Sequence, residues 1–407
     1  MKIKDIVTFL SKSITPQKGV TYNLYSLPSF DEGKTFEVLD GADIQSNKYD
    51  VPNKCILFNK LNVRFKRVWR IDSHDENKIA STEFLPLVVD EDVVDFQYCY
   101  YLLISDKITN YLCGQNTNTS GSHKRIDPDN FLNIEIKLPK MSIQRQVGKT
   151  LSALDRKIVL NKQINDNLEA MAKQLYDYWF VQFDFPNEEG KPYKSSGGAM
   201  VWNEKLKREI PQGWHCGTLL DIAEYTNGLA CQKYRPTDNN KLPVIKIKEM
   251  HDGLSADTEW VKTDIPDDVK VFDGDVLFSW SASLEVMLWA YGNGGLNQHI
   301  FKVTSKNGYP RSFYFYQLIH YVGIFKQMAE ARKTTMGHIT QDHLKQSTIA
   351  LPPNVDIANK LEEKLCPIFD EIVKNNQEII VLTKQRDELL PLLMNSQASI
   401  NYHLSDD

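Results

Sequence analysis

Two long stretches of the chain carry apolar residues at alternating steps of four and three. This spacing is typical of a helix that buries one narrow face against another helix. It predicts helices over residues 141–182 and 353–396, both interrupted by asparagine on the apolar face. The residues expected to form the seam are Leu151, Leu154, Ile158, Asn161, Leu168 and Leu175 in the first helix, and Leu365, Ile372, Asn376, Ile379 and Leu390 in the second.

One apolar stripe alone would more simply pack on its own domain. Two matched stripes favour helices that pack on each other, with Asn161 and Asn376 fixing the register. Pro367 falls inside the second stripe. Because proline removes a backbone donor and clashes with the preceding turn, we expect that helix to kink or to begin anew there.

The rest of the chain shows shorter patterns. Residues 1–140 and 215–352 mix β-like runs, such as KCILFN and PVIKIK, with helix-like runs, such as FQYCYYLLISDKITNYL. The pattern predicts an α+β chain of two globular α/β domains, each followed by one long helix. Residues 183–214 are polar and contain Gly, Pro and Ser clusters, which indicates a linker.

The two halves also resemble each other in sequence. KIKDIVTF at 2–9 is similar to TLLDIAEY at 218–225, and CILFNKL at 55–61 to DVLFSWS at 275–281. Leu-Pro at 138–139 recurs at 351–352, and LDRKIVLN at 154–161 is similar to FDEIVKNN at 369–376. Each match is weak, but their common order and spacing indicate an internal duplication.

Composition is that of a folded protein: of 407 residues, 42% are hydrophobic and 25% charged. The net charge of −5 gives no overall basic bias, so a nucleic-acid partner would have to meet a local patch. The six cysteines are scattered, which argues against a zinc site or a disulfide framework. We find neither a signal-peptide core nor a membrane-length apolar run, and we expect a cytoplasmic protein with no membrane partner.

Catalytic signatures are missing from the sequence. It contains no phosphate-binding loop of the Gly-Lys-Ser/Thr type and no HExxH helix. His338, Asp342 and His343 match no standard metal spacing and are interpreted as surface residues. We therefore expect no catalytic residues and no metal in this chain.

One run is strongly basic. KLNVRFKRVWR at 60–70 holds Lys60, Arg64, Lys66, Arg67 and Arg70 without an acid, interleaved with Phe65 and Trp69. Such a segment can neutralise phosphates and reach base edges. The alternative is an exposed strand with a solvated charged face.

Further candidates for DNA contact lie elsewhere. Lys124-Arg125 and Arg332-Lys333 occupy matching positions beside Thr and Gly, which suits phosphate contact. The other candidates, chosen for charge or for base-reading side chains, are Lys233, Arg235, Lys246, Lys248, Trp280, Asn297 and Gln298.

Several segments carry a resemblance to a known family. YDYWFVQFDFPNEEGKPYKSSGGAMVW at 176–202, followed by EIPQGW at 209–214, resembles the central region of specificity subunits of type I restriction–modification enzymes. RDELLPLLM at 386–394 resembles their C-terminal conserved region, and GDVLFSW with LNQHIFKV at 296–303 resembles one type of their target-recognition domains. The similarity covers essentially the full length.

The resemblance implies the following organisation. Target-recognition domains over 1–140 and 215–352 each read one half of a split DNA sequence, and the two helices pair antiparallel as a spacer. The chain itself is non-catalytic and docks two methyltransferase subunits and motor-nuclease subunits in the prokaryotic cytoplasm, for defence against phage. S-adenosylmethionine, ATP and Mg²⁺ are expected on those partners, where adenine is flipped out and methylated, and no cofactor is expected in this chain.

The chain departs from the family pattern at Pro367 and at its N-terminus, where KIKDIV lacks the Pro-x-Gly-Trp found at 211–214. Two other functions stay open on the sequence. One is a coiled-coil scaffold whose heads bind peptides, and the other is a two-domain nuclease or methyltransferase with an unrecognised site.

Overall fold

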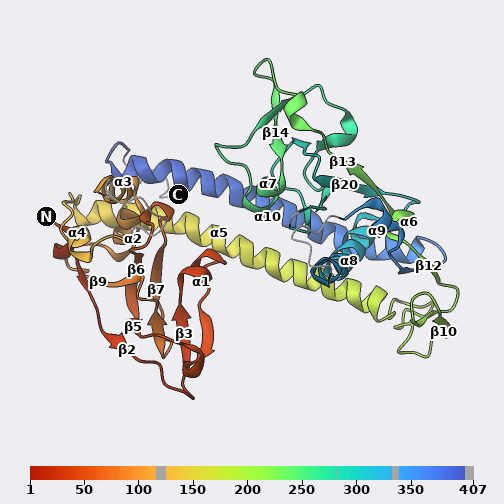
Figure 1. Ribbon diagram of the computed structural model, residues 1–407, viewed down its shortest axis with the longest axis horizontal. Helices are drawn as coiled ribbons and strands as arrows, with labels where there is room; N and C mark the ends of the chain where they lie inside the picture. The colour runs from red at the N-terminus through yellow and green to blue at the C-terminus, as the bar shows by residue number, and fades with distance from the viewer. Residues whose placement is uncertain (116–124, 282, 332–338, 399–407) are drawn as a thin grey trace, which may run out of the picture. The chain divides into compact units, whose positions relative to one another are not determined.

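The computed structural model describes residues 1–115, 125–281, 283–331 and 339–398 (Figure 1). The chain divides into two compact units, the first formed by Met1–Lys157 with Leu382–Asp407 and the second by Ile158–Val381. Each unit contains a globular part and portions of two long helices, α5 (Met141–Tyr176) and α10 (Asp356–Met394). None of the helices in the described ranges is long and apolar enough to cross a membrane.

Two sheets build the globular part of the first unit. An antiparallel sheet has the order β1 (Val7–Phe9), β9 (Phe84–Val89), β6 (Lys54–Asn59), β7 (Val68–Asp72). The other has the order β2 (Ser13–Ile14), β5 (Lys48–Asp50), β8 (Lys78–Ala80), β3 (Thr21–Tyr25), β4 (Glu37–Asp40), and its β3–β8 pair is parallel. The helices of this part are α1 (Leu27–Asp31), α2 (Phe96–Ile104), α3 (Asp106–Gln115) and α4 (Pro128–Leu132), with the 3-10 turns η1 (Ile3–Asp5), η2 (Gly41–Asp43) and η3 (Val63–Phe65).

The second unit repeats this topology, except that the second of the two sheets has four strands in the described residues in place of five. Its antiparallel sheet has the order β13 (Ala223–Asn227), β20 (Ile300–Ser305), β17 (Val276–Ser279), β18 (Glu285–Leu288). The other sheet has the order β15 (Trp260–Lys262), β14 (Lys241–Ile245), β19 (Gly294–Leu296), β16 (Lys270–Val271), and its β14–β19 pair is parallel. The remaining elements are α6 (Leu219–Ile222), α7 (Ile247–Asp252), α8 (Arg311–Ala331), α9 (Gln341–Lys345), the pairs β10 (Met200–Asn203) with β11 (Arg208–Pro211) and β12 (His215–Gly217) with β21 (Ile349–Leu351), the π-helical turn η4 (Asp177–Val181), and η5 (Cys231–Lys233) and η6 (Asp267–Val269).

Strand register confirms the duplication inferred from the sequence. Phe58 on β6 lies opposite Leu85 on β9, and Phe278 on β17 lies opposite Phe301 on β20. The Leu-Phe pairs at 57–58 and 277–278 therefore hold the same place in equivalent sheets. The antiparallel sheets of the two units therefore agree in register.

The hydrophobic core of each unit joins its antiparallel sheet to helices. In the first unit, the sheet packs with α2 and with parts of both long helices, and residues such as Leu87, Tyr98, Leu151 and Leu393 belong to one buried cluster. In the second unit, the equivalent sheet packs with α8 and with other parts of the long helices in a second cluster. Burial of these apolar faces stabilises the helices more than their local propensities do.

In the first unit the two long helices meet at a polar contact. Asp155 on α5 accepts a hydrogen bond from Arg386 on α10 at 3.1 Å and another from the Tyr101 hydroxyl at 2.5 Å. Burial first, and then the charge of Asp155, raises the pKa of Tyr101 well above its usual value. The hydroxyl therefore stays protonated and donates to the carboxylate that holds the arginine.

In the second unit the seam holds a buried asparagine cluster. Asn165 on α5 donates to Asn376 at 2.8 Å and accepts from Asn375 at 3.0 Å on α10. Asn161 donates to Glu378 at 2.7 Å. Partner numbers fall along α10 as they rise along α5, so the helices run antiparallel. The expected partnership of Asn161 with Asn376 is replaced by Asn165 with Asn375 and Asn376.

The other seam candidates lie on the inner faces of the two helices. Leu151, Ile158, Asn161, Leu365 and Ile372 are buried, and Leu154, Leu168, Leu175, Asn376, Ile379 and Leu390 are half-buried.

Two expectations about local structure are corrected. Helix α10 does not begin anew at Pro367, because it is a single helix from Asp356 to Met394. The Pro367 ring lies on the exposed face, where water can satisfy the carbonyl that loses its donor. The segment 183–214 is not a polar linker either, since it forms β10 and β11 and buries Phe183, Phe185 and Trp214 in the core of the second unit.

The asparagine cluster gives a stability prediction. Replacing Asn165 by Ala leaves the amides of Asn375 and Asn376 without their partners in a buried seam, and we expect a loss of about 2 kcal/mol in the free energy of unfolding. Chemical denaturation followed by circular dichroism measures the loss. Asn167→Ala, on the exposed face of α5, is the matched control. Equal stability of the two variants would contradict a structural role for the cluster.

Candidate nucleic-acid interface

The basic run at 60–70 does not lie along one exposed strand. It leaves the end of β6, turns through η3 and enters β7. Trp69 is only 8% exposed and packs edge-on against Tyr25 and Phe30 in a small core of the first unit. Trp69 is therefore a packing residue, and the sequence could not separate it from the exposed Phe65.

Several cations of this run are held by partners distant in sequence. Arg67 makes a two-pronged pair with Asp31 on α1 at 2.7 and 2.6 Å. Lys66 pairs with Asp106 on α3 at 2.5 Å. These acids were missed by the sequence reasoning because nothing in the local pattern brings residues 31 and 106 next to the run.

The remaining basic candidates of the first unit differ in exposure. Arg70 is half-buried, donates to Gln97 and lies over the Tyr100 ring at 5.0 Å. Arg125 is exposed and makes a two-pronged pair with Glu83. Lys60 is half-buried, and Arg64 is exposed at the turn.

Three of the predicted contact residues, Lys124, Arg332 and Lys333, lie outside the described residues.

In the second unit, four predicted cations lie on or directly next to η5 and α7. Lys233 and Arg235 are exposed on and just after η5. Lys246 pairs with Glu259 at 2.5 Å, and Lys248 lies 3.9 Å from Asp257. The hydrogen bond from the Lys246 ammonium lowers the pKa of the Glu259 carboxyl.

The predicted base-reading residues of the second unit come together near the end of β17. The Trp280 indole donates to Asn227 at 3.1 Å, and its ring lies 5.7 Å from the ring of His299. Asn297 accepts from the His299 amide at 3.3 Å, and the exposed Gln298 side chain lies 3.3 Å from the His299 ring. The cluster presents amide and imidazole groups, which can hydrogen-bond base edges. Asn227 was missed because it comes from the distant strand β13.

The two units carry a corresponding strand–helix contact, with the acidic residue exchanged between helix and strand. Arg67 beside β7 pairs with Asp31 of α1 in the first unit. In the second unit the same strand position holds Glu285, 3.9 Å from His251 of α7. Sheet register makes Arg67 equivalent to Glu285, and the place of each helix after its strand makes Asp31 equivalent to His251.

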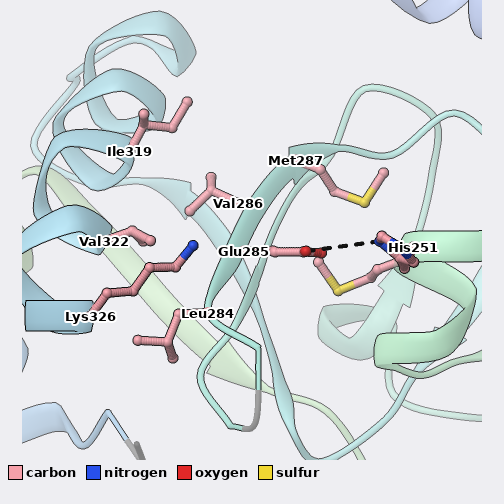
Figure 2. A pocket seen from close by; sticks show the side chains of 9 residues that line it. His251, Leu284, Glu285, Val286, Met287, Ile319, Val322 and Lys326 are labelled. Carbon is pink, nitrogen blue, oxygen red and sulfur yellow. Dashed lines mark ion pairs between the residues drawn. The ribbon is translucent and has the colours of Figure 1, made fainter. Parts of the chain in front are cut away.

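The exchange accompanies a change in packing. In the first unit Trp69 and Phe30 fill the space between strand and helix, whereas Met287 and Met250 take these places in the second. Met250 and Met287 line a pocket of about 380 Å³, together with other residues of β18 and with residues of α8 (Figure 2). Figure 2 shows Val286 and Leu284 directed toward α8, and Glu285 and Met287 directed toward His251.

One of the two histidines considered as metal ligands, His343, lies within the described residues. His343 accepts a hydrogen bond from the backbone of Thr340 at 3.0 Å, in the capping box at the start of α9. His338 lies outside the described residues. Within the described ranges, no group of three or more potential ligands could hold a metal ion.

Comparison with known proteins defines the class of this duplicated fold. The chain belongs to the family described as the type I restriction modification DNA specificity domain, whose profile matches residues 1–170 and 211–385. The two matched ranges fall in the two halves of the duplication.

Relatives and solved structures agree with this family. The chain is 25% identical over 330 residues to the Type I restriction enzyme MjaIX specificity subunit of Methanocaldococcus jannaschii, covering 78% of this chain and 73% of the relative. It is 23% identical over 426 residues to the Type I restriction enzyme HindI specificity subunit of Haemophilus influenzae, covering 86% and 90%. Its fold is similar to that of the type I restriction–modification S subunit from M. genitalium, with a TM-score of 0.58, 13% identity, and coverage of 97% and 95%.

The packing difference between the units predicts opposite effects of reciprocal substitutions. Met250→Phe supplies ring volume to the pocket and should raise the free energy of unfolding by about 1 kcal/mol. Phe30→Met removes a ring that contacts Trp69 and should lower it by about 1 kcal/mol. Differential scanning fluorimetry of the two variants measures both shifts. A loss of stability in Met250→Phe would show that the pocket does not accept a ring.

Proposed function

We propose that this chain is the non-catalytic, sequence-reading subunit of a type I restriction–modification complex, and that each unit reads one half of a split DNA target. The observation that carries this proposal is the duplicated two-sheet domain, which shares strand order and register but not surface side chains. One scaffold with two different surfaces suits the reading of two different half-sequences.

In this proposal, each polar residue has a role that depends on whether it already has a partner within the chain. Cations in internal ion pairs, such as Lys66, Arg67 and Lys246, hold the loops in place. Exposed cations, such as Arg64 and Lys233, contact phosphates. The Trp280–His299 cluster, with Asn297 and Gln298, reads base edges in the second unit. Arg125, whose side chain is exposed although it pairs with Glu83, contacts phosphate as well. So do Lys124, Arg332 and Lys333, which lie outside the described residues.

The partners follow from the family. The complex would contain methyltransferase subunits, which bind S-adenosylmethionine and methylate adenine, and motor-nuclease subunits, which use ATP and Mg²⁺. The docking surface for the methyltransferases would be the long helices, whose outer faces expose Leu160, Ile164 and Met171 on α5.

Methylation mapping tests the proposal directly. Loss of this gene should abolish adenine methylation at one split motif in the host genome and leave other modified motifs unchanged. Long-read sequencing of native DNA from the parent and the deletion strain measures this, and complementation with the intact gene is the control. An unchanged set of modified motifs would contradict the proposal, whereas a peptide-binding scaffold would show no preference for DNA in a gel-shift assay.

The helices give a second test. Both α5 and α10 contain residues of each unit, so an inserted helical turn in both helices changes the separation of the two units by about 5.4 Å. The unread gap of the target should then lengthen by one or two base pairs, since DNA rises about 3.4 Å per base pair. Methylation mapping of the variant reads out the gap. An unchanged gap would mean that the helices do not set the spacing.

A further inference from the structure

The turn between β6 and β7 of the first unit presents one exposed aromatic side chain with two guanidinium groups close to its ring. Phe65 is 52% exposed. The Arg64 guanidinium lies 4.7 Å from the centre of its ring, and that of Arg67 lies 4.8 Å away. A single exposed apolar residue is ordinary on a protein surface. An exposed ring next to two cations is the combination that nucleic-acid surfaces use for stacking and phosphate contact.

The backbone holds this turn in an unusual conformation. Asn62 and Lys66, which bracket η3, both have left-handed backbone angles, with φ of 51° and 49°. Residues other than glycine rarely adopt this conformation, and they persist in it where the surroundings enforce it. The two left-handed residues reverse the chain and direct Phe65 away from the core in which Val63 is buried.

Side-chain contacts fix both ends of the turn. Asn59, which is only 2% exposed, accepts from the Leu61 amide at 2.8 Å and donates to the Leu61 carbonyl at 2.5 Å. At the other end, Lys66 and Arg67 pair with Asp106 and Asp31. The turn is therefore positioned before any ligand binds, which reduces the entropy lost on binding.

The two arginines differ in their freedom. Arg67 is committed to Asp31, and its side chain is 16% exposed. Arg64 is exposed and, within the described ranges, has no carboxylate partner. Arg64 can leave the ring for a phosphate while Arg67, held by Asp31, keeps its contact with the ring.

The second unit does not repeat this feature in the described part of its equivalent connection. Buried Ser279 corresponds to Asn59, and it holds the connection by accepting from the Glu285 amide at 3.0 Å. The aromatic residue there, Trp280, is half-buried, bonded to Asn227 and next to the His299 ring. The exposed ring close to two arginines therefore distinguishes the first unit from the second.

We propose that Phe65 is a wedge that enters one half of the DNA target and unstacks a base step, while Arg64 binds an adjacent phosphate. This proposal rests on the proposed function and deepens it for the first unit. Apolar side chains that insert between base pairs select flexible steps, because unstacking costs less there. Phe65 thus contributes to specificity through deformability, whereas the second unit reads edges through amide and imidazole groups.

The experiment uses the full-length chain co-purified with the methyltransferase subunits of its own system. Duplexes carry 2-aminopurine at successive positions of the target defined by methylation mapping. Apart from the adenines that the methyltransferase subunits flip out, the wild-type complex should raise the fluorescence at one further position, in one half only, because unstacking relieves quenching. Phe65→Ala should abolish this rise and weaken binding about tenfold, and Phe65→Leu should retain part of the rise.

The salt dependence of DNA binding separates the contribution of charge from that of stacking. Phe65→Ala should leave the slope of log affinity against log salt unchanged, while Arg64→Ala should reduce that slope by about one. Phe36→Ala, at another exposed phenylalanine of the same unit (38% exposed), is the matched control and should bind as the wild type does.

The outcomes separate two failures. A wild-type complex that shows no preference for the mapped target overturns the proposed function and the wedge together. A wild-type complex with a clear preference that Phe65→Ala retains in full overturns the wedge alone. Weaker binding by Phe65→Ala without a wild-type fluorescence rise outside the flipped adenines also overturns the wedge, because it would mean contact without unstacking.

Discussion

A buried polar group must find a hydrogen-bond partner, and the seam between α5 and α10 depends on this constraint. Apolar contacts alone would let two helices slide past each other by a turn, since one leucine packs much like the next. Asn165 allows no such shift, because its amide needs both Asn375 and Asn376. Asp155 has the same effect in the first unit, where Arg386 and Tyr101 meet on one carboxylate. The globular parts are attached to helices whose pairing is specified by a few polar atoms.

The two duplicated units have kept the same backbone framework, but their surface side chains differ. Strand order and register are the same in the two antiparallel sheets, and a buried polar residue, Asn59 or Ser279, holds the equivalent connection in each. Around this framework the side chains differ: Phe65 is exposed in one unit, and Trp280 is tethered in the other. A protein that recognises two unrelated half-sequences needs this combination, because the same backbone must present different surface side chains.

The periodic features were predictable from the sequence. The alternating spacing of four and three residues between apolar positions predicted both helices, because burial of one helix face imposes a regular period on the sequence. The Leu-Phe pairs likewise predicted equivalent strands in the two halves. The partners of Arg67 and Lys66 were not predictable, since Asp31 and Asp106 approach only after the chain folds. The polar composition of 183–214 led to the wrong prediction of a linker, because Phe183 and Trp214 have hydrophilic neighbours in sequence but are buried in the hydrophobic core. Pro367 was tolerated because it lies on the exposed side of α10.

The strand–helix contact, Arg67 with Asp31 in one unit and Glu285 with His251 in the other, affects how the two halves can recombine. A hybrid that took β18 from the second unit and α1 from the first would bring Glu285 to Asp31, two like charges. The opposite hybrid would bring Arg67 to His251 and would leave the guanidinium without a carboxylate partner at this position. Only exchanges that carry helix and strand together keep each carboxylate next to its partner. Transfer of the whole stretch from α1 to β7, or from α7 to β18, keeps each of these contacts as it is in its own unit.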